Sequence, residues 1–441
     1  MGSRPHVLAV LPGFIPSTVL TVVKPLTALH RAGQIIADIT LESWVSRRKI
    51  ERADVVIFSR NTEPSFGQVL EIALACGKPV IYDIDDNFFE LPAYYQNELS
   101  HRTPEHLVQL ERYLTTATRV RVYSELMRKR VDQLNPQVSR VDGAVDWQLL
   151  PPPRLRRDPE VIRIVYPTSR WLKDDLSSLF LADLQQILTV YPGQVELYFW
   201  GYHPPELRGH SAVHCLDFVP DYDRFFREFA RTGFDIGLAP LRDEVFYRSK
   251  SNNKFREYAA CRIAGVYSDV DVYSACVEDG QTGLLVSAEP GAWFTALARL
   301  IEDTALRERV QEQAFGYARA HYSLEKFYAV WLAHISQAIA DARGTARGLG
   351  VPCAYQNELL TSQPLVSRTS IQERRSLGFL AHFVRRWVRL VNNLKTRGMA
   401  ATVNRVLQPL RDLRMLLHVR WNLSPASSYC PWGKRFNRQS R

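Results

Sequence analysis

Short apolar runs alternate with amphipathic segments through the first part of the chain. Strand-like runs are expected at residues 6–12, 35–41, 53–59, 78–83, 119–124 and 136–145. Helices are expected between them at residues 19–31, 66–76, 105–116 and 125–134. Because strands that alternate with helices form parallel sheets, this order predicts a sheet covered by helices on both faces. Ligands of such a sheet bind beyond the carboxyl ends of its strands.

A second round of the pattern follows residues 151–157, a proline-rich segment that predicts an exposed linker. Strands are expected at residues 162–166, 195–200, 214–219 and 234–240, and helices at 174–190 and 222–231. Three more helices are expected at residues 293–301, 306–320 and 324–339. We therefore predict an α/β protein of two doubly wound, Rossmann-like domains, residues 1–150 and 151–340, that face each other across a cleft.

A loop that leads into a helix carries the strongest candidate chemistry. Lys250 and Lys254 lie at this junction, where free backbone N–H groups and the positive end of the helix dipole attract phosphate. Glu257 follows Lys254 by one helical turn, so the two side chains share a face. A cation for phosphate beside a carboxylate for sugar hydroxyls predicts a nucleotide-sugar site. The polar residues between the two lysines are Ser251, Asn252 and Asn253.

Together with residues 273–286, this stretch resembles the donor-site signature of a known enzyme family. The matching pieces are Glu-Tyr-Ala-Ala at 257–260, Gly-Val-Tyr-Ser at 265–268 and Asp-Gly-Gln-Thr-Gly-Leu-Leu at 279–285, in that order. In this order and spacing they resemble the retaining glycosyltransferases of the GT-B fold in family 4, the group 1 glycosyl transferases. The resemblance covers about residues 5 to 335.

The resemblance implies roles for several basic and polar residues. Lys254 and Arg170 would stabilise the departing diphosphate, and Glu257 would hold the ribose hydroxyls. Lys173 would also reach the diphosphate, or would simply belong to a solvated basic loop. The backbone of two further residues would line the donor site. These are Tyr273 and Ser274.

The chain departs from the family pattern in one place. The usual pair is two Glu with seven residues between them, and counting back from Glu257 places Ser249 at the position of the first Glu. This loss leaves open how the sugar's own hydroxyls are held. It does not affect the diphosphate site, which depends on cations and free amides.

Acidic residues crowd the end of the fourth expected strand. Asp85 or Asp86 is expected to bond the acceptor hydroxyl, and Asp83 and Gly13 to lie on the acceptor side of the cleft. One alternative is that these carboxylates only end a strand and start a turn. Another is Mg²⁺ binding by the Asp-x-Asp pattern, which is typical of a different fold class. We expect neither a metal nor a cofactor.

The carboxyl-terminal segment differs from the rest in charge. Residues 371–441 contain 15 Lys and Arg against two acids, a net charge of +13, which leaves −3 of the total +10 for the other residues. Two expected helices, residues 377–394 and 401–419, follow a linker at 341–370. A basic α-helical tail of this kind suits an anionic membrane surface through residues 371–420. The alternative is a helical hairpin that packs on the body. No nucleic-acid-binding motif is present.

Composition adds limits on class and location. Of the 441 residues, 46% are hydrophobic, which fits a globular protein, and we expect no membrane span and no signal peptide. The six scattered cysteines predict reduced thiols and a cytoplasmic protein. If the basic tail binds a membrane, the protein is peripheral on its inner face.

We therefore predict transfer of a sugar from a nucleoside-diphosphate sugar to a saccharide or lipid-linked saccharide, as in polysaccharide or glycolipid assembly. Two alternatives stay open. One is a nucleotide-sugar epimerase or hydrolase of the same fold. The other is a non-catalytic binding subunit. A dehydrogenase is disfavoured, because the loop after the first strand lacks the glycine-rich fingerprint.

Overall fold

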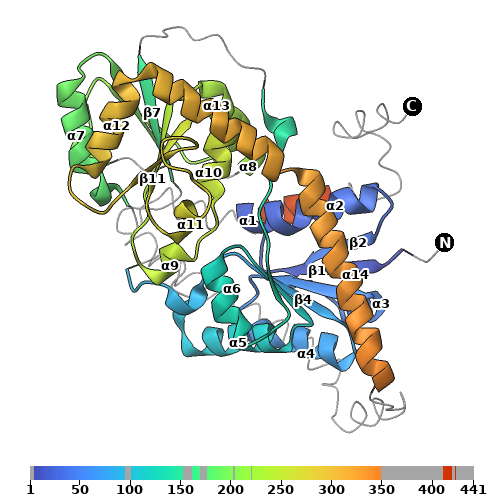
Figure 1. The fold of residues 1–441 in the computed structure, drawn as a ribbon. Coiled ribbons are helices and arrows are strands. Elements are labelled where there is room, and N and C mark those ends of the chain that lie inside the picture. The colour runs from blue at the N-terminus through green and yellow to red at the C-terminus, as the bar shows by residue number, and fades with distance from the viewer. Residues whose placement is uncertain are drawn as a thin grey trace, which may run out of the picture.

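The computed structural model describes residues 4–94, 101–151, 161–168, 176–201, 204–219, 221–348, 411–419 and 423. Two six-stranded sheets, each flanked by helices, form two domains (Figure 1). All neighbouring strands within each sheet run parallel. The predicted architecture of two doubly wound domains is confirmed.

The first sheet has the strand order β2-β1-β3-β4-β5-β6. Its strands are β1 (His6–Leu11), β2 (Ile36–Leu41), β3 (Val55–Ser59), β4 (Val80–Ile84), β5 (Arg119–Val122) and β6 (Val138–Arg140). Every residue of β3 and β4 is buried, as expected for parallel strands that are covered on both faces. The helices of this domain are α1 (Pro16–Thr18), the π-helix η1 (Val19–Val23), α2 (Lys24–Arg31), α3 (Arg47–Arg52), η2 (Pro64–Phe66), α4 (Gly67–Ala75), η3 (Phe88–Glu90), α5 (Pro104–Thr116), α6 (Glu125–Asp132) and η5 (Trp147–Leu149).

The second sheet has the order β12-β11-β10-β7-β8-β9. Its strands are β7 (Ile162–Pro167), β8 (Val195–Trp200), β9 (Val213–Leu216), β10 (Ile236–Ala239), β11 (Ala264–Ser268) and β12 (Leu284–Val286). Its helices are η7 (Ser177–Leu179), α7 (Leu181–Val190), η8 (Pro205–Leu207), α8 (Tyr222–Thr232), α9 (Val245–Arg248), α10 (Asn253–Ala260), α11 (Asp271–Ser274), α12 (Ala292–Glu302) and α13 (Thr304–His321).

A glycine in β10 allows the helix α10 to pack closely on the sheet. A Cβ atom on Gly237 would lie 2.6 Å from the ring of Tyr258, which is fully buried. The Tyr258 hydroxyl donates a hydrogen bond of 2.6 Å to the carbonyl of Leu238. Because this ring has no room to move, Gly237 sets the distance between β10 and α10.

The helix predicted at residues 19–31 starts earlier and contains a π-helical turn. It runs from Pro16 to Arg31 through α1, η1 and α2. Pro25 has no N–H to donate to the carbonyl of Thr21 one turn before it. The indole of Trp331 donates to that carbonyl instead, at 2.7 Å. The tertiary contact thus satisfies the backbone group that the proline leaves without a helical partner.

Trp331 belongs to α14 (Leu324–Gly348), which crosses from the second domain back to the first (Figure 1). Its side chains Phe327, Trp331 and Ile335 share an apolar cluster with β1 and α2. The guanidinium of Arg121, which is fully buried in β5, lies 3.7 Å from the centre of the Trp331 ring. The last part of the predicted domain 151–340 therefore packs on the first domain.

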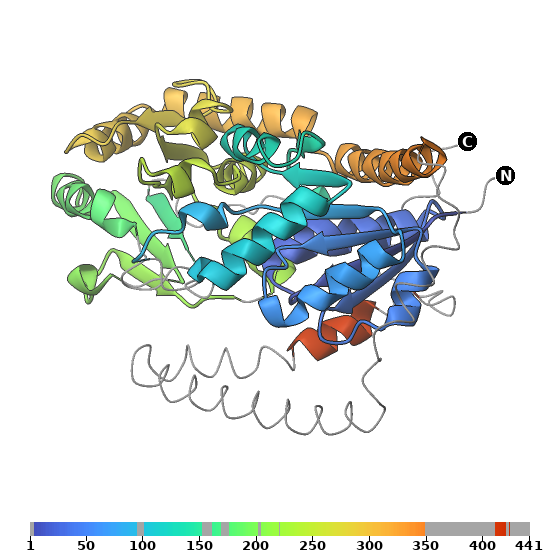
Figure 2. The same ribbon diagram turned by 90° about the horizontal axis from the view of Figure 1, so that it is seen from below.

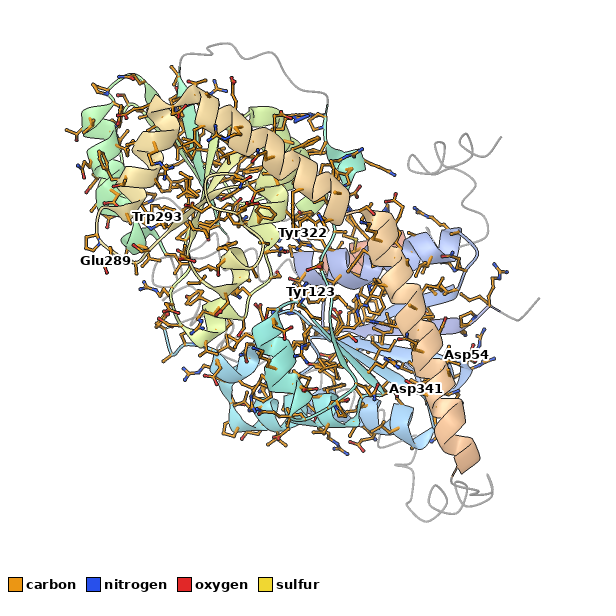
Figure 3. The ribbon with its side chains drawn as sticks, viewed as in Figure 1. Asp54, Tyr123, Glu289, Trp293, Tyr322 and Asp341 are labelled. Atoms are coloured by element: carbon orange, nitrogen blue, oxygen red, sulfur yellow. The ribbon has the colours of Figure 1, made fainter. Side chains whose placement is uncertain are left out.

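The same helix corrects the start of the linker predicted at residues 341–370. Asp341 lies in α14 and pairs with Arg119 of β5 at 2.7 Å (Figure 3). The helix continues to Gly348, since Ala and Arg favour a helix and one glycine costs only about 1 kcal/mol. The rest of this linker lies outside the described residues.

Of the basic tail, the structure describes a helix at residues 411–419 and residue 423. This tail helix packs on the first domain (Figure 2). Its Leu416 and Val419 are 0% and 2% exposed, in one cluster with β1 and α2. For this helix, the alternative of packing on the body is confirmed. The predicted helix at residues 377–394 lies outside the described residues.

Candidate active site

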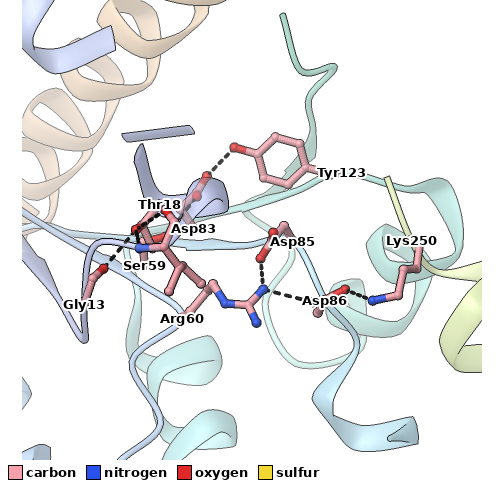
Figure 4. A network of polar contacts seen from close by, with 10 residues as sticks. Gly13, Thr18, Ser59, Arg60, Asp83, Asp85, Asp86, Tyr123 and Lys250 are labelled. Carbon is pink, nitrogen blue, oxygen red and sulfur yellow. Dashed lines mark hydrogen bonds and ion pairs between the residues drawn. The ribbon is translucent and has the colours of Figure 1, made fainter. Parts of the chain in front are cut away.

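Polar residues form a row along the carboxyl edge of the first sheet, where a ligand was expected. Gly13 follows β1, Arg60 follows β3, and Asp85 and Asp86 follow β4 (Figure 4). Because β1, β3 and β4 are neighbours in the sheet, their carboxyl ends lie side by side.

Asp83 lies at the inner end of this row and is 1% exposed. Its carboxylate accepts hydrogen bonds from Arg121 at 3.1 Å, Tyr123 at 2.9 Å and Ser59 at 3.3 Å. Burial raises the pKa of Asp83, although the charge of Arg121 opposes the rise. Direct contact with an acceptor would require these bonds to break, so the geometry indicates a supporting position for Asp83.

Arg60 is a site residue that the sequence analysis missed. Its guanidinium pairs with Asp85 and, at 3.0 Å, with Asp86. It is 5% exposed, and its backbone has φ of 61°, a left-handed conformation that is costly for a residue other than glycine. Backbone strain of this kind gathers at functional sites.

Asp86 links the two domains through Lys250, which lies in the loop between α9 and α10 (Figure 4). Burial opposes the charge on Asp86, but Lys250 and Arg60 outweigh it and hold its pKa well below the usual value. The Lys250 ammonium also lies 4.1 Å from the centre of the Phe246 ring. The structure thus brings a predicted acceptor residue into contact with a predicted donor residue.

Ser249, which stands where the family pattern has its first Glu, lies in the contact between the domains. It is 1% exposed. Its hydroxyl accepts from Asn87 of the first domain at 3.1 Å, and its carbonyl accepts from Ser124 at 2.7 Å. A second contact joins the Tyr94 hydroxyl to Glu244 at 2.6 Å. A small side chain at position 249 therefore lets the domains approach at this point.

On the donor side, the helix α10 begins at Asn253, as the loop-to-helix pattern predicted. Lys254 and Glu257 pair at 2.9 Å on one face of the helix. The other oxygen of Glu257 accepts from the Tyr222 hydroxyl at 3.1 Å. Each carboxylate oxygen has a second acceptor position, so Glu257 could hold ribose hydroxyls while it keeps these partners.

The other predicted donor residues vary in how they are placed. Asn252 donates to the Tyr322 hydroxyl at 2.9 Å, within the second domain, and Asn253 accepts from Arg256. Ser251 is half-buried in the loop between α9 and α10.

Further along the chain, Tyr273 is buried with its ring 4.8 Å from that of Tyr267, so only its backbone is available to a ligand. Ser274 is exposed, and its hydroxyl donates to the carbonyl of Val270 at 3.1 Å. Arg170 and Lys173 lie outside the described residues.

Two further titratable groups lie near the row and were also missed. Glu42 follows β2 and accepts from Asn61 at 2.6 Å, and its burial raises its pKa to about 7. His101 bonds Thr62 at 2.6 Å and stacks on Phe88 at 4.3 Å. Burial, followed by the charge of Arg60, lowers the pKa of His101 to about 4. At neutral pH this imidazole is therefore uncharged.

Within the described residues, no group of three His, Cys, Asp or Glu side chains is placed to hold a metal ion. The Asp residues of the row face cations instead: Arg121 pairs with Asp83, and Arg60 with Asp85 and Asp86. In the same part of the chain, no helix is long and apolar enough to cross a membrane.

Solved structures share this arrangement of two facing α/β domains. Sucrose-phosphate synthase (tll1590) from Thermosynechococcus elongatus aligns with a TM-score of 0.58 at 13% identity, over 76% of this chain and 99% of that chain. Anabaena Alr3699/HepE in complex with UDP and glucose aligns with a TM-score of 0.55 at 12% identity, over 76% and 100%. A putative UDP-N-acetylglucosamine 2-epimerase from Listeria monocytogenes aligns with a TM-score of 0.51 at 11% identity, over 77% and 98%.

These alignments and the two parallel sheets define a GT-B fold. Residues 164–303, which include Lys250, Lys254 and Glu257, match the family model described as Glycosyl transferases group 1. The match covers most of the second domain and none of the first. A comparison with curated proteins found no match for this chain.

Proposed function

We propose that the protein transfers a sugar from a nucleoside-diphosphate sugar to an acceptor hydroxyl, with retention of anomeric configuration as in family 4. The observation that carries this proposal is the start of α10. There Lys254 and Glu257 share one helix face, and Lys250 faces the acidic row of the first domain.

In this proposal the diphosphate binds the free N–H groups at the start of α10. Lys254 and Arg170 stabilise the negative charge that grows on the leaving diphosphate as the glycosidic bond breaks. Glu257 holds the ribose hydroxyls, and Tyr222 keeps its carboxylate in place. The leaving diphosphate takes the acceptor's proton, so the reaction requires neither a metal nor a dedicated protein base.

The acceptor lies along the row on the first domain. Asp85 and Asp86 are the proposed partners of its hydroxyl, since their side chains are 12% and 15% exposed while Asp83 is enclosed. The bound nucleotide is first sought as UDP, because Alr3699/HepE, which shares the fold, was solved with UDP.

We further propose that the acceptor is lipid-linked and that the basic tail brings the enzyme to the inner face of the membrane, in polysaccharide or glycolipid assembly. The charge of +13 over residues 371–441 supports this proposal. The described tail helix also leaves Leu413 and Leu417 exposed, at 37% and 57%.

A second candidate function is epimerisation or hydrolysis of the nucleotide sugar. It is favoured by the same-fold match to a putative UDP-N-acetylglucosamine 2-epimerase. Neither reaction needs a second sugar, so a free sugar or an isomerised donor would appear without any acceptor. A non-catalytic binding subunit would bind the nucleotide without turning the donor over.

The test is a thermal-shift panel of nucleoside diphosphates and their sugars on the wild type, Lys254→Ala and Lys49→Ala. Lys49 of α3 pairs with Asp38 of β2, so the Lys49→Ala variant is a control for the loss of a lysine outside the proposed site. A ligand at about 100 times its Kd stabilises the native state by about 2.7 kcal/mol. We expect one nucleotide to stabilise the wild type and Lys49→Ala but not Lys254→Ala. If no nucleotide of the panel stabilises the wild type, the proposed donor site is contradicted.

A further inference from the structure

The carboxyl-terminal tail contributes a carboxylate to the loop after β1. The backbone N–H of Phe14 donates to Asp412 of the tail helix at 3.0 Å, in a buried position. The other Asp412 oxygen lies 3.6 Å from the place that a Cβ on Gly13 would occupy. Asp412 is only 9% exposed, although it is one of just two acids among residues 371–441.

The tail helix is anchored on both sides of this contact. Leu416 and Val419 are buried in the apolar cluster of β1 and α2. Beyond the helix, the imidazole of His30 in α2 donates to the carbonyl of Leu423 at 3.2 Å. These contacts hold Asp412 against the loop.

The loop itself is fixed from its other side by Thr18. The Thr18 hydroxyl lies 2.9 Å from the Gly13 carbonyl and 3.0 Å from the Ile15 carbonyl, and it accepts from the Ile15 N–H at 3.2 Å. Thr18 of the first domain therefore bonds the backbone groups of Gly13 and Ile15, and Asp412 of the tail bonds the backbone N–H of Phe14.

This loop starts the polar row of the candidate site. β1 pairs directly with β3, so the loop after β1 lies beside the residues that follow β3, Arg60 among them. Figure 4 shows Gly13 and Thr18 next to Ser59 and Asp83. A shift of the loop would therefore move one wall of the acceptor side.

We propose that Asp412 is a positioning residue, and that the tail helix forms a working part of the cleft by fixing the Gly13–Phe14 loop. The inference rests on the proposed function for its kinetic consequence. Its structural consequence, an ordered loop, stands apart from that function.

The experiment compares full-length Asp412→Ala and Asp412→Asn with the wild type. Arg414→Gln, on the exposed face of the same helix, is the matched control. Amide hydrogen exchange is measured over residues 13–18. UDP release is measured with UDP-glucose and the other UDP-sugars of the panel as donors, in the presence of simple saccharides as acceptors.

We expect Asp412→Ala to exchange faster over residues 13–18 and to lower kcat for UDP release by about tenfold, the effect of losing a hydrogen bond to a charged group. KM for the UDP-sugar should stay within about twofold, because α10 is untouched. Asp412→Asn keeps an acceptor oxygen for Phe14 and should recover most of both effects. Arg414→Gln should behave as the wild type.

Unchanged exchange in Asp412→Ala would overturn the proposal, and so would unchanged or increased kcat, because an increase would mean that the carboxylate obstructs the cleft. If no saccharide acceptor supports UDP release and no nucleotide of the thermal-shift panel stabilises the wild type, the proposed function fails. The exchange measurement then still decides whether Asp412 fixes the loop.

Discussion

Lys250 has its charge balanced by Asp86 in this structure, although a bound diphosphate would compete for the same ammonium group. Lys250 and Arg60 hold the pKa of Asp86 well below its usual value despite burial, so Asp86 stays ionised at neutral and mildly acidic pH. An anion that must be displaced weakens the binding of another anion. Asp86 is thus a competitor of the proposed donor as well as a candidate acceptor residue.

We predict that Asp86→Asn binds UDP more tightly, on the order of tenfold, because Lys250 loses its competing charge. Turnover should fall at the same time, since the proposed acceptor partner is lost. Titration calorimetry with UDP measures the first effect, and UDP release from the UDP-sugar in the presence of a saccharide acceptor measures the second. Asp38→Asn, which removes a carboxylate from the Lys49 pair, is the control. Weaker UDP binding would instead mean that Asp86 holds Lys250 in the position that phosphate needs.

A site residue could be predicted when its partners lie close to it in the sequence. Asp85 and Asp86 are adjacent in sequence and end a buried strand, so their crowding was visible. Arg60 is a single arginine after a strand, and its partner Asp85 lies 25 positions away. Glu42 likewise depends on Asn61, 19 positions away. Pairings over such distances follow from the sheet order, which periodicity does not fix.

At the scale of elements, the position of α10 depends on its packing against β10. Gly237 leaves the space that the ring of Tyr258 fills, and Tyr258 shares α10 with Lys254 and Glu257. The geometry of the proposed donor site therefore depends on the absence of a side chain in the sheet beneath it.

We predict that Gly237→Ala destabilises the protein by about 1–3 kcal/mol through overpacking. It should also reduce the stabilisation by UDP, because α10 must shift. Gly316→Ala is the matched control: it lies within α13, a Cβ there would meet open space, and it should gain about 0.5–1 kcal/mol. Thermal unfolding with and without UDP measures both. Equal midpoints for the two variants would contradict this account of the packing.

Periodicity predicted most elements because the core is built from regular apolar patterns. The strands and longer helices agree with the predicted ranges within a few residues at most ends. The π-helical turn of η1 was not predicted, since it depends on Pro25 together with the distant Trp331. The short helix α9 was not predicted either, because four residues are too few to show a helical repeat of apolar positions.

At the scale of the whole molecule, charge separates the body from the tail. Residues 371–441 carry +13 and the rest of the chain −3. The contacts that set one domain against the other join residues far apart in the sequence, 164 positions in the pair of Asp86 and Lys250 and 199 in the pair of Lys24 and Asp223. Sequence patterns predicted both domains and the basic tail, but not how these parts meet.

We predict that the full-length protein sediments with vesicles of phosphatidylglycerol and phosphatidylcholine at low salt, and much less at high salt. Each basic residue near an anionic surface contributes about 1 kcal/mol, and salt screens it. Vesicles of phosphatidylcholine alone should not bind it. The variant with Leu413→Gln and Leu417→Gln keeps the charge and should bind more weakly. Failure to bind anionic vesicles at low salt would contradict a membrane role for the tail.

The return of α14 to the first domain has a consequence for synthesis. The apolar cluster of β1 and α2 is completed by Phe327, Trp331 and Ile335, and then by Leu416 of the tail helix. On the ribosome, the first domain is made first yet must wait for these residues before its core closes. The second sheet and helices α7 to α13 lie within residues 162–321 and can close earlier. The domain that emerges last can thus be the first to finish folding.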